Sequence, residues 1–126
     1  MTIGVKDVRA IGLGIGTRVV PEWPDGWTAS ADWAEVEWRG CSDATGRMIG
    51  SAWEGQPGVL RVVDYPVDEI CVMLTGSVAV IDDTGERRVF RAGEAFLFPR
   101  GFTGQWETLE PSSKIFVVLE PAPESA

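Results

Sequence analysis

Apolar residues lie in short runs separated by turn-forming residues through most of the chain. Runs with apolar residues at helical spacing are short and are interrupted by some of the 15 glycines and 8 prolines. Several short strands with frequent turns are typical of a β-sandwich or barrel, so the pattern predicts an all-β protein. The predicted strands comprise residues 17–20, 34–38, 48–54, 59–64, 69–74, 77–82, 86–90, 95–98, 103–108 and 114–119.

The turns and irregular segments indicate one structural domain of 126 residues with two appendages. The turn Asp82-Asp83-Thr84-Gly85 predicts a hairpin between the strands on either side, because glycine accepts the positive φ that a tight reversal requires. Residues 1–46 are expected to form an irregular arm and the first strands, packed on the outside of a barrel or on a second subunit. Residues 47–120 are expected to form the barrel core, and residues 121–126 a frayed tail.

Two glycine-containing motifs lie beyond the middle of the chain. In the first, Gly76 follows Glu69 by seven residues; in the second, Gly93, Pro99 and Gly101 keep the order Gly, five residues, Pro, one residue, Gly. These spacings resemble the paired motifs of the cupins. The wider sequence is similar to small single-domain bacterial cupins grouped with the (S)-ureidoglycine aminohydrolase cupin domain. The resemblance implies a cupin (RmlC-like jelly-roll) β-barrel with an irregular N-terminal arm.

The resemblance covers about residues 45–119. A typical cupin binds a metal ion in this region with three histidines and a glutamate. This chain contains no histidine. The counterparts of the two first-motif histidines are Val63 and Tyr65, or the residues one position earlier, and the counterpart of the second-motif histidine is Gly104. Divalent transition metals prefer nitrogen, thiolate or several carboxylate donors. We therefore expect no metal and no other cofactor, with Cys71 the one further residue that would favour a metal.

The family resemblance also predicts which side chains face the barrel interior. If Glu69 points inward as in other cupins, Cys71 and Met73 do so too, because side chains two residues apart share one face of a strand. A second inward row comprises Arg61, Val63 and Tyr65, and Trp53 and Trp106 are candidate aromatic walls. Lys114 and Phe116 share a face and are candidates for a third row, but the sequence does not fix which face of the last strand is inward.

A carboxylate inside a barrel costs free energy unless a cation or several hydrogen-bond donors neutralise it. Glu69 is therefore expected to pair with Arg61 or Lys114. In one interpretation the pair only fixes the barrel. In the other, Glu69 is a general acid or base, the basic residue orients an anionic group, and Tyr65 donates a hydrogen bond to a substrate.

One inward position stays open between two registers. The cupin register turns Trp106 inward, whereas the comparison with the aminohydrolase pattern places Gln105 there. Cys71 fits a small core residue better than a nucleophile, because the chain has no histidine to activate it. The candidate catalytic residue is Glu69. The candidate ligand-binding residues are Trp53, Arg61, Tyr65, Cys71, Gln105, Trp106 and Lys114.

The charge balance, 11 basic and 19 acidic residues with a formal net charge of -8, argues against nucleic acid and anionic lipid surfaces as partners. No stretch approaches the roughly 20 apolar residues that span a bilayer, and the first residues do not read as a secretory signal. We expect a cytoplasmic protein in which both cysteines are reduced thiols. Four tryptophans are expected to anchor the N-terminal arm to the barrel or to a partner, which favours a homodimer: Trp23, Trp27, Trp33 and Trp38.

Three functions are compatible with these residues. The first is a metal-free cupin that binds a small polar metabolite in its barrel. The second is an enzyme of the aminohydrolase or isomerase type, implied by the resemblance, which acts on a small nitrogenous or carboxylated metabolite with Glu69 as acid or base. The third is a structural or accessory subunit whose barrel is filled by its own side chains, such as Met73, Phe96, Phe98 and Phe116.

Overall fold

The computed structural model of the chain describes residues 2–123, and these residues are folded almost entirely from β-strands. A single turn of 3-10 helix, η1 (Val5–Asp7), precedes the first strand. The strands are β1 (Thr17–Val19), β2 (Thr28–Ala29), β3 (Glu35–Ser42), β4 (Met48–Gly55), β5 (Gly58–Val62), β6 (Asp68–Thr75), β7 (Ser77–Asp82), β8 (Arg87–Arg91), β9 (Ala95–Phe98), β10 (Gly104–Thr108) and β11 (Ser112–Leu119).

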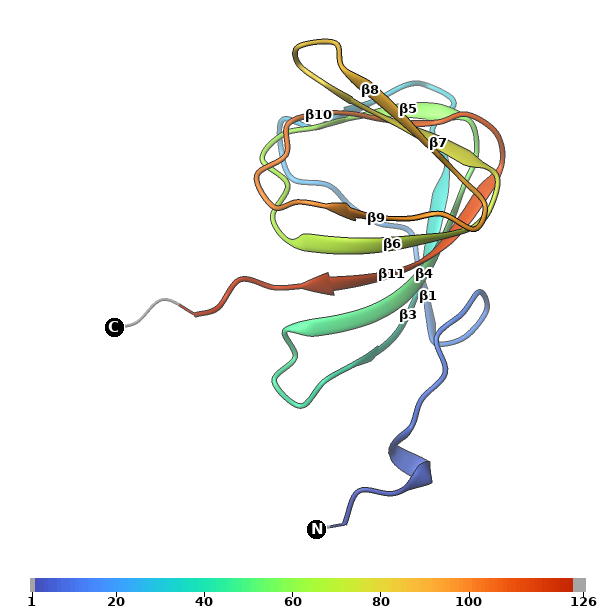
Figure 1. Ribbon diagram of the computed structural model, residues 1–126, viewed down its shortest axis with the longest axis vertical. Helices are drawn as coiled ribbons and strands as arrows, with labels where there is room; N and C mark the ends of the chain where they lie inside the picture. Colours follow the sequence, from blue (N-terminus) through green and yellow to red (C-terminus); the bar gives the residue numbers. More distant parts are fainter. Residues whose placement is uncertain (1, 124–126) are drawn as a thin grey trace.

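The strands form two antiparallel sheets that face one another and curve into a jelly-roll barrel (Figure 1). The six-stranded sheet has the order β1-β3-β4-β11-β6-β9, and the five-stranded sheet has the order β2-β5-β10-β7-β8. The all-β jelly-roll barrel predicted from the sequence is confirmed. The predicted hairpin is confirmed as well, since β7 and β8 pair antiparallel across the turn that ends in Gly85.

Alternation of side chains explains why these residues form two-sided strands. In β6, Glu69, Cys71 and Met73 are buried, whereas the residues between them, such as Ile70 and Val72, face outward and are exposed. The ten strands predicted from the sequence correspond to ten observed strands with small shifts at their ends. The sequence pattern did not reveal β2, whose two residues are too few to show alternation.

The N-terminal third differs from the expected arm. β3 is eight residues long and is an inner strand of the six-stranded sheet, so it belongs to the barrel itself. The segment between β1 and β3 crosses to the other sheet, where β2 pairs with β5. The segment that contains η1 stands clear of the barrel (Figure 1). Residues 124–126 of the expected tail lie outside the described residues.

The hydrophobic core lies between the two sheets. Its buried members come from both sheets: Trp53, Leu60, Val62, Cys71, Met73, Val78, Phe98, Trp106 and Phe116. Gly76 closes the β6–β7 turn with a φ of 78°, and a Cβ atom there would lie 2.5 Å from the carbonyl oxygen of Pro111. The first-motif glycine is therefore required by both its conformation and its contacts.

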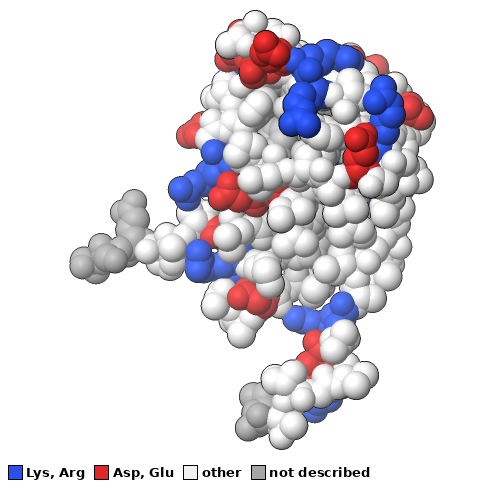
Figure 2. All heavy atoms as spheres, viewed as in Figure 1, with Lys and Arg blue, Asp and Glu red and all other residues white. Residues whose placement is uncertain are grey.

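The outer surface carries charges of both signs. The face in Figure 2 shows basic and acidic side chains interspersed, with uncharged atoms over most of the remaining area. Within residues 2–123, no helix has the length and apolar character needed to span a membrane.

Candidate functional site

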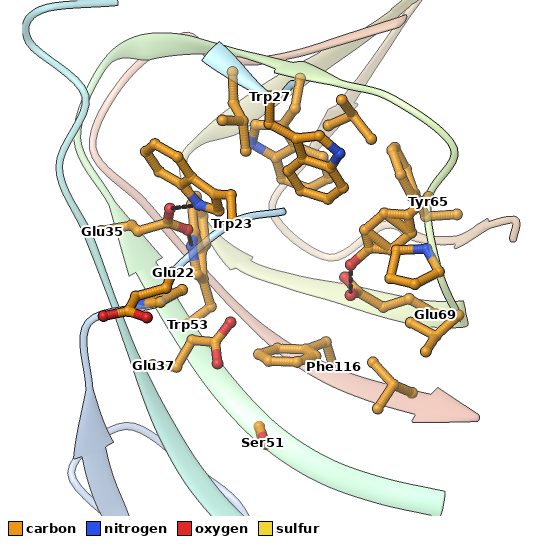
Figure 3. A pocket seen from close by; sticks show the side chains of 18 of the residues that line it. Glu22, Trp23, Trp27, Glu35, Glu37, Ser51, Trp53, Tyr65, Glu69 and Phe116 are labelled. Atoms are coloured by element: carbon orange, nitrogen blue, oxygen red, sulfur yellow. Dashed lines mark hydrogen bonds between the residues drawn. The ribbon is translucent and has the colours of Figure 1, made fainter. Parts of the chain in front are cut away.

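A cavity of about 400 Å³ lies between the two sheets. Its walls come from the inward faces of β3, β4, β6 and β11 in one sheet, from β5 and β10 in the other, and from residues 21–33, which join β1 to β3 (Figure 3). Sites for small molecules in proteins have volumes of roughly 300 to 1,000 Å³. The cavity is thus large enough for a small metabolite.

Four polar side chains on one wall form what we call the Glu69 cluster: Tyr65, Glu69, Cys71 and Lys114. The Tyr65 hydroxyl donates a hydrogen bond of 2.6 Å to Oε1 of Glu69. The Lys114 ammonium and the Cys71 thiol donate to Oε2, at 2.8 Å and 2.9 Å. β11 pairs with β6 so that Lys114 and Met73 are partners, which places Lys114 close to Glu69 and Cys71. Both oxygens of the buried carboxylate are therefore satisfied.

The Glu69 cluster holds its groups in their usual protonation states. Burial by itself raises the pKa of Glu69, but the Lys114 ammonium and the hydrogen bonds from Cys71 and Tyr65 outweigh burial and lower that pKa. Burial by itself lowers the pKa of Lys114, and the neighbouring Cys71 and Glu69 outweigh it and raise that pKa. Burial raises the pKa of the Tyr65 phenol and of the Cys71 thiol. Because proton transfer is most efficient when the pKa lies near the working pH, this cluster is poorly suited to acid–base chemistry.

Aromatic rings surround the Lys114 ammonium. Its Nζ atom lies 4.2 Å from the ring centre of Trp106, 5.1 Å from that of Trp53 and 5.2 Å from that of Phe116. These distances are within the range of cation–π attraction. The cavity wall thus stabilises the ammonium group of Lys114 with the Glu69 carboxylate and with three aromatic rings.

A second cluster, which we call the indole cluster, is built around Glu35 of β3. Its carboxylate accepts hydrogen bonds from three indole N–H groups, those of Trp23 at 3.0 Å, Trp33 at 2.6 Å and Trp53 at 2.9 Å. Trp23 and Trp33 belong to the segment that joins the two sheets, and Trp53 belongs to β4. One carboxylate therefore fastens that segment to the barrel wall (Figure 3).

Glu37, two residues further along β3, also faces the cavity (Figure 3). Its side chain is 19% exposed, and its ion pair within the described chain is with Arg39, whose Nε lies 3.3 Å away and whose own side chain is 55% exposed. Burial raises the pKa of Glu37, and Arg39 offsets only part of this effect. Glu37 is therefore a partly desolvated carboxylate that its surroundings do not fully neutralise.

Most of the residues predicted for the site lie in it. Five of them line the cavity, and Cys71 lies behind Glu69 in the same cluster. The cationic partner of Glu69 is Lys114 and not Arg61. The five lining residues are Trp53, Tyr65, Glu69, Trp106 and Lys114.

The prediction that Arg61 faces the interior is wrong. Leu60 and Val62 are the buried residues of β5, so Arg61 points outward, where it pairs with Asp83. The expected inward row assumed an uninterrupted alternation back from Tyr65. Asp64 has a φ of 51°, a left-handed conformation that breaks this alternation between the strand and Tyr65.

The register of β10 resolves the open choice between Gln105 and Trp106. Gly104 and Trp106 are buried on the inward face, while Gln105 is exposed. Gln105 therefore lies outside the cavity. Val63 is 40% exposed and points away from the interior as well, which leaves Val62 as the inward residue at that level.

Sequence reasoning missed the residues of the β3 wall and of the joining segment. Glu35 and Glu37 lie two apart and so share a strand face, which alternation alone could have indicated, but no motif marks that face as part of a site. Three of the tryptophans assigned to anchoring the arm also line the cavity: Trp23, Trp27 and Trp33. Trp27 stacks on Tyr65 with ring centres 5.8 Å apart, which brings the segment onto the Glu69 cluster.

The side chains present do not fit the metal site of a typical cupin. At Gly104, the counterpart of one histidine, a Cβ atom would collide with the carbonyl oxygen of Ile81 and with the Phe102 ring, so no ligand side chain has room there. The Lys114 ammonium takes up one oxygen of Glu69, and the shifts in pKa keep Tyr65 protonated. No group of three or more His, Cys, Asp or Glu side chains suited to a metal ion occurs in residues 2–123.

Residues 43–116 match the EutQ-like cupin domain, which is more than half of the chain. The chain therefore belongs to the EutQ-like cupin family. This family assignment agrees with the jelly-roll barrel and with the two glycine motifs. The finer resemblance to the (S)-ureidoglycine aminohydrolase group stays a prediction.

Solved structures with related folds include the EutQ protein of Clostridium difficile, with a TM-score of 0.58 and 19% identity over 69% of this chain and 70% of that chain. A DUF861 family protein of Thermotoga maritima is 29% identical over 54% of this chain and 76% of that chain, with a TM-score of 0.51. A DUF861 family protein of unknown function from Pseudomonas syringae has a TM-score of 0.67 and 14% identity over 82% of this chain and 44% of that chain. These likenesses carry no activity over to the chain, and no curated protein matches it.

Proposed function

We propose that the chain is a small-molecule-binding cupin that holds a small polar metabolite in its barrel without a metal ion. The observation that carries this proposal is the cavity of about 400 Å³, whose wall combines aromatic rings with carboxylates. Small-molecule sites characteristically combine apolar walls with a few placed polar groups. The Lys114 ammonium supplies the positive charge that Glu69 would otherwise receive from a metal.

An enzyme of the aminohydrolase or isomerase type, with Glu69 as acid or base, is the alternative. The lowered pKa of Glu69 and its three hydrogen bonds favour binding over catalysis. Replacement Glu69→Gln separates the two functions once a ligand is known. A binding protein should keep its fold and lose some affinity, whereas an enzyme should keep binding and lose turnover by about 10² to 10⁴.

A purely structural barrel, filled by its own side chains, receives less support. Met73 and Phe98 are buried in the core as that interpretation requires. A cavity nevertheless remains between the sheets, with polar groups directed into it. A structural filler has no need of such a lining.

The proposal is tested by elemental analysis and native mass spectrometry of protein purified without an affinity tag. We expect no stoichiometric metal, together with a retained small molecule that is released when the protein is denatured. Stoichiometric zinc, iron, manganese or copper would overturn the metal-free assignment. As a control for nonspecific carry-over, the denatured and refolded protein should no longer contain the molecule.

We also propose that the chain acts as a homodimer. On the outer face of the six-stranded sheet, Ile70 is 52% exposed and its neighbour Leu97, which pairs with it across β6 and β9, is 59% exposed. The N-terminal arm carries the exposed apolar residues Ile3, Val5 and Val8 and stands clear of the barrel (Figure 2). Each copy of the chain carries the exposed sheet face and the exposed N-terminal segment. In a dimer, each copy can therefore cover these surfaces of the other.

Sedimentation velocity over a range of concentrations tests the dimer. The double variant Ile70→Lys/Leu97→Lys should sediment as a monomer at concentrations at which the unmodified chain is dimeric. The control Val20→Lys places one lysine at an exposed apolar residue just after β1, outside the strands β6 and β9 that carry Ile70 and Leu97, and it should remain dimeric. A monomeric unmodified chain would reject the proposal.

A further inference from the structure

Five carboxylates but only two basic side chains are among the residues that line the cavity: Glu22, Glu35, Glu37, Glu69 and Glu120, against Arg39 and Lys114. Lys114 is committed to Glu69 at 2.8 Å. Arg39 is the remaining basic residue of the lining, and its side chain is more than half exposed. The cavity therefore has an excess of negative charge, which favours positive ligands over negative ones.

We propose that the ligand is an organic cation, namely a protonated amine on a small apolar body, with its ammonium group at Glu37 and its body against the indole rings. This inference deepens the proposed binding function and rests on it. It names the chemical class of the ligand and the carboxylate that recognises it.

Glu37 is the carboxylate best placed to receive the charge. Glu69 has both oxygens occupied within the Glu69 cluster, and Glu35 uses both oxygens for three indole N–H groups. Glu37 is directed into the cavity and is largely buried, and its contact with the exposed Arg39 is a single one at 3.3 Å. A salt bridge to an exposed arginine contributes little, so an ammonium group from a ligand would neutralise Glu37 more fully.

The aromatic walls suit a cation as well. The chain itself places an ammonium group, that of Lys114, against the rings of Trp53, Trp106 and Phe116. Trp53 also pairs with Glu37 across β3 and β4, so aromatic surface continues from the Lys114 position to Glu37. Carboxylates and aromatic faces together are the chemistry by which proteins recognise ammonium groups.

Anionic ligands lack a comparable site. A carboxylated metabolite would need a free basic side chain inside the barrel. Arg61, which was expected to supply it, lies outside and pairs with Asp83, and Arg39 of the lining is more than half exposed and is already in contact with Glu37. Any anion at the Glu37 position would be repelled by Glu37 and by Glu35. The same geometry that favours an amine therefore disfavours a carboxylate.

Three probes of the same size and different charge test the inference: benzylammonium, benzyl alcohol and benzoate. Each is titrated into ¹⁵N-labelled protein at neutral pH and low salt, and the indole N–H resonances of the cavity tryptophans report binding. We expect benzylammonium to bind at least about tenfold more tightly than benzyl alcohol, and benzoate to show no saturable binding. Equal affinities for the three probes, or preference for benzoate, would overturn the inference and leave the binding function standing.

The variant Glu37→Gln should reduce the affinity for benzylammonium about tenfold and leave that for benzyl alcohol unchanged. Glu54→Gln is the matched control, because it removes the same charge from the adjacent strand β4 but lies outside the cavity lining. The spectrum of each variant also reports whether the protein is folded. Equal losses in both variants would refute a specific role for Glu37. The probes are added up to about 20 mM, a concentration at which even very weak binding is detected. If no probe shifts the indole N–H resonance of any cavity tryptophan, both the cation inference and the binding function fail.

Discussion

Glu69 and Glu37 are both carboxylates that line the same cavity, but the protein neutralises the charge of Glu69 much more fully than that of Glu37. Around Glu69, a lysine, a tyrosine and a cysteine supply three hydrogen bonds, and the pKa of the carboxyl is lowered although it is buried. Around Glu37, burial outweighs the partial help of Arg39 and the pKa is raised. The folded protein therefore stabilises the ionised form of Glu69 and destabilises the ionised form of Glu37.

The difference distinguishes a group that completes the structure from a group that is available to a ligand. A buried charge whose partners are all internal gains nothing from a ligand, while a partly desolvated charge without full compensation gains a partner when a cation binds. By this criterion Glu69, at the position of the cupin metal ligand, already has its partners within the chain, and Glu37, which no motif marks, is the candidate for recognition of the ligand's charge.

The largest expected effect comes from removing the cation of the Glu69 cluster. The replacement Lys114→Met leaves Glu69 buried without its ion-pair partner, and it should lower the free energy of unfolding by about 3 to 5 kcal/mol. Urea unfolding followed by circular dichroism measures this change. The double variant Lys114→Met/Glu69→Gln should recover a large part of the loss, because no charge is then left unpaired. A double variant as unstable as the single one would show that packing, and not charge, dominates.

The indole cluster should show the next largest effect. In Glu35→Gln, one amide oxygen replaces two carboxylate oxygens that accept from three indole N–H groups, so at least one donor loses its partner. We expect a loss of about 1 to 3 kcal/mol in the free energy of unfolding. The control Glu54→Gln should change it far less. Equal unfolding midpoints for the two variants would contradict the account of Glu35 as the residue that fastens the joining segment.

The pH dependence of stability should separate Glu69 from Glu37 by sign. The folded pKa of Glu69 is lowered, so its contribution is present above the unfolded pKa, near 4.3, and is lost as the pH falls through the folded pKa. The folded pKa of Glu37 is raised, so ionisation of Glu37 costs stability as the pH rises past the unfolded pKa.

Urea unfolding of the unmodified chain and of the variants Glu69→Gln and Glu37→Gln between about pH 3 and 7 measures these slopes. As the pH falls, the unmodified chain should lose stability relative to Glu69→Gln and gain stability relative to Glu37→Gln. Slopes of the same sign for the two comparisons would remove the distinction between the two acids.

The smallest effect is expected at Arg61, the residue that the sequence placed in the site and the structure places outside it. Arg61→Ala removes an exposed ion pair with Asp83. Exposed pairs of this kind contribute little, so stability and the affinity for benzylammonium should both stay within measurement error. A clear loss of affinity would show that Arg61 reaches the cavity in solution.

The fold was predictable because it depends on patterns that the chain repeats many times. The resemblance to the cupins places Glu69 on the inward face of β6, and the two-residue period of a strand then places Cys71 and Met73 there as well. The same period puts Lys114 and Phe116 on one face of β11, but the sequence did not fix which face of that strand is inward. The hairpin turn ending in Gly85 has a local signature that no tertiary contact needs to supply. Each of these inferences relies on neighbouring residues and on a strand's period of two.

The Glu37 side was not predictable in the same way. In β3 the apolar residues Val36 and Trp38 alternate with the carboxylates that line the cavity, and Val36 is itself buried, so hydrophobicity does not mark the cavity face of this strand. Arg61 was misplaced because one residue, Asp64, takes a left-handed conformation that ends the strand's alternation. The position of the joining segment depends on hydrogen bonds from distant tryptophans to Glu35, and a sequence pattern carries no record of such contacts.

The distribution of tryptophans has an optical consequence. Five of the six line the cavity, namely Trp23, Trp27, Trp33, Trp53 and Trp106, while Trp38 lies on the outer face of β3. Ultraviolet emission from this protein therefore originates mainly from the walls of its site, where the rings are close enough to exchange excitation energy. A molecule that enters the cavity changes the polarity around several emitters at once, so the unlabelled chain is its own fluorescent sensor.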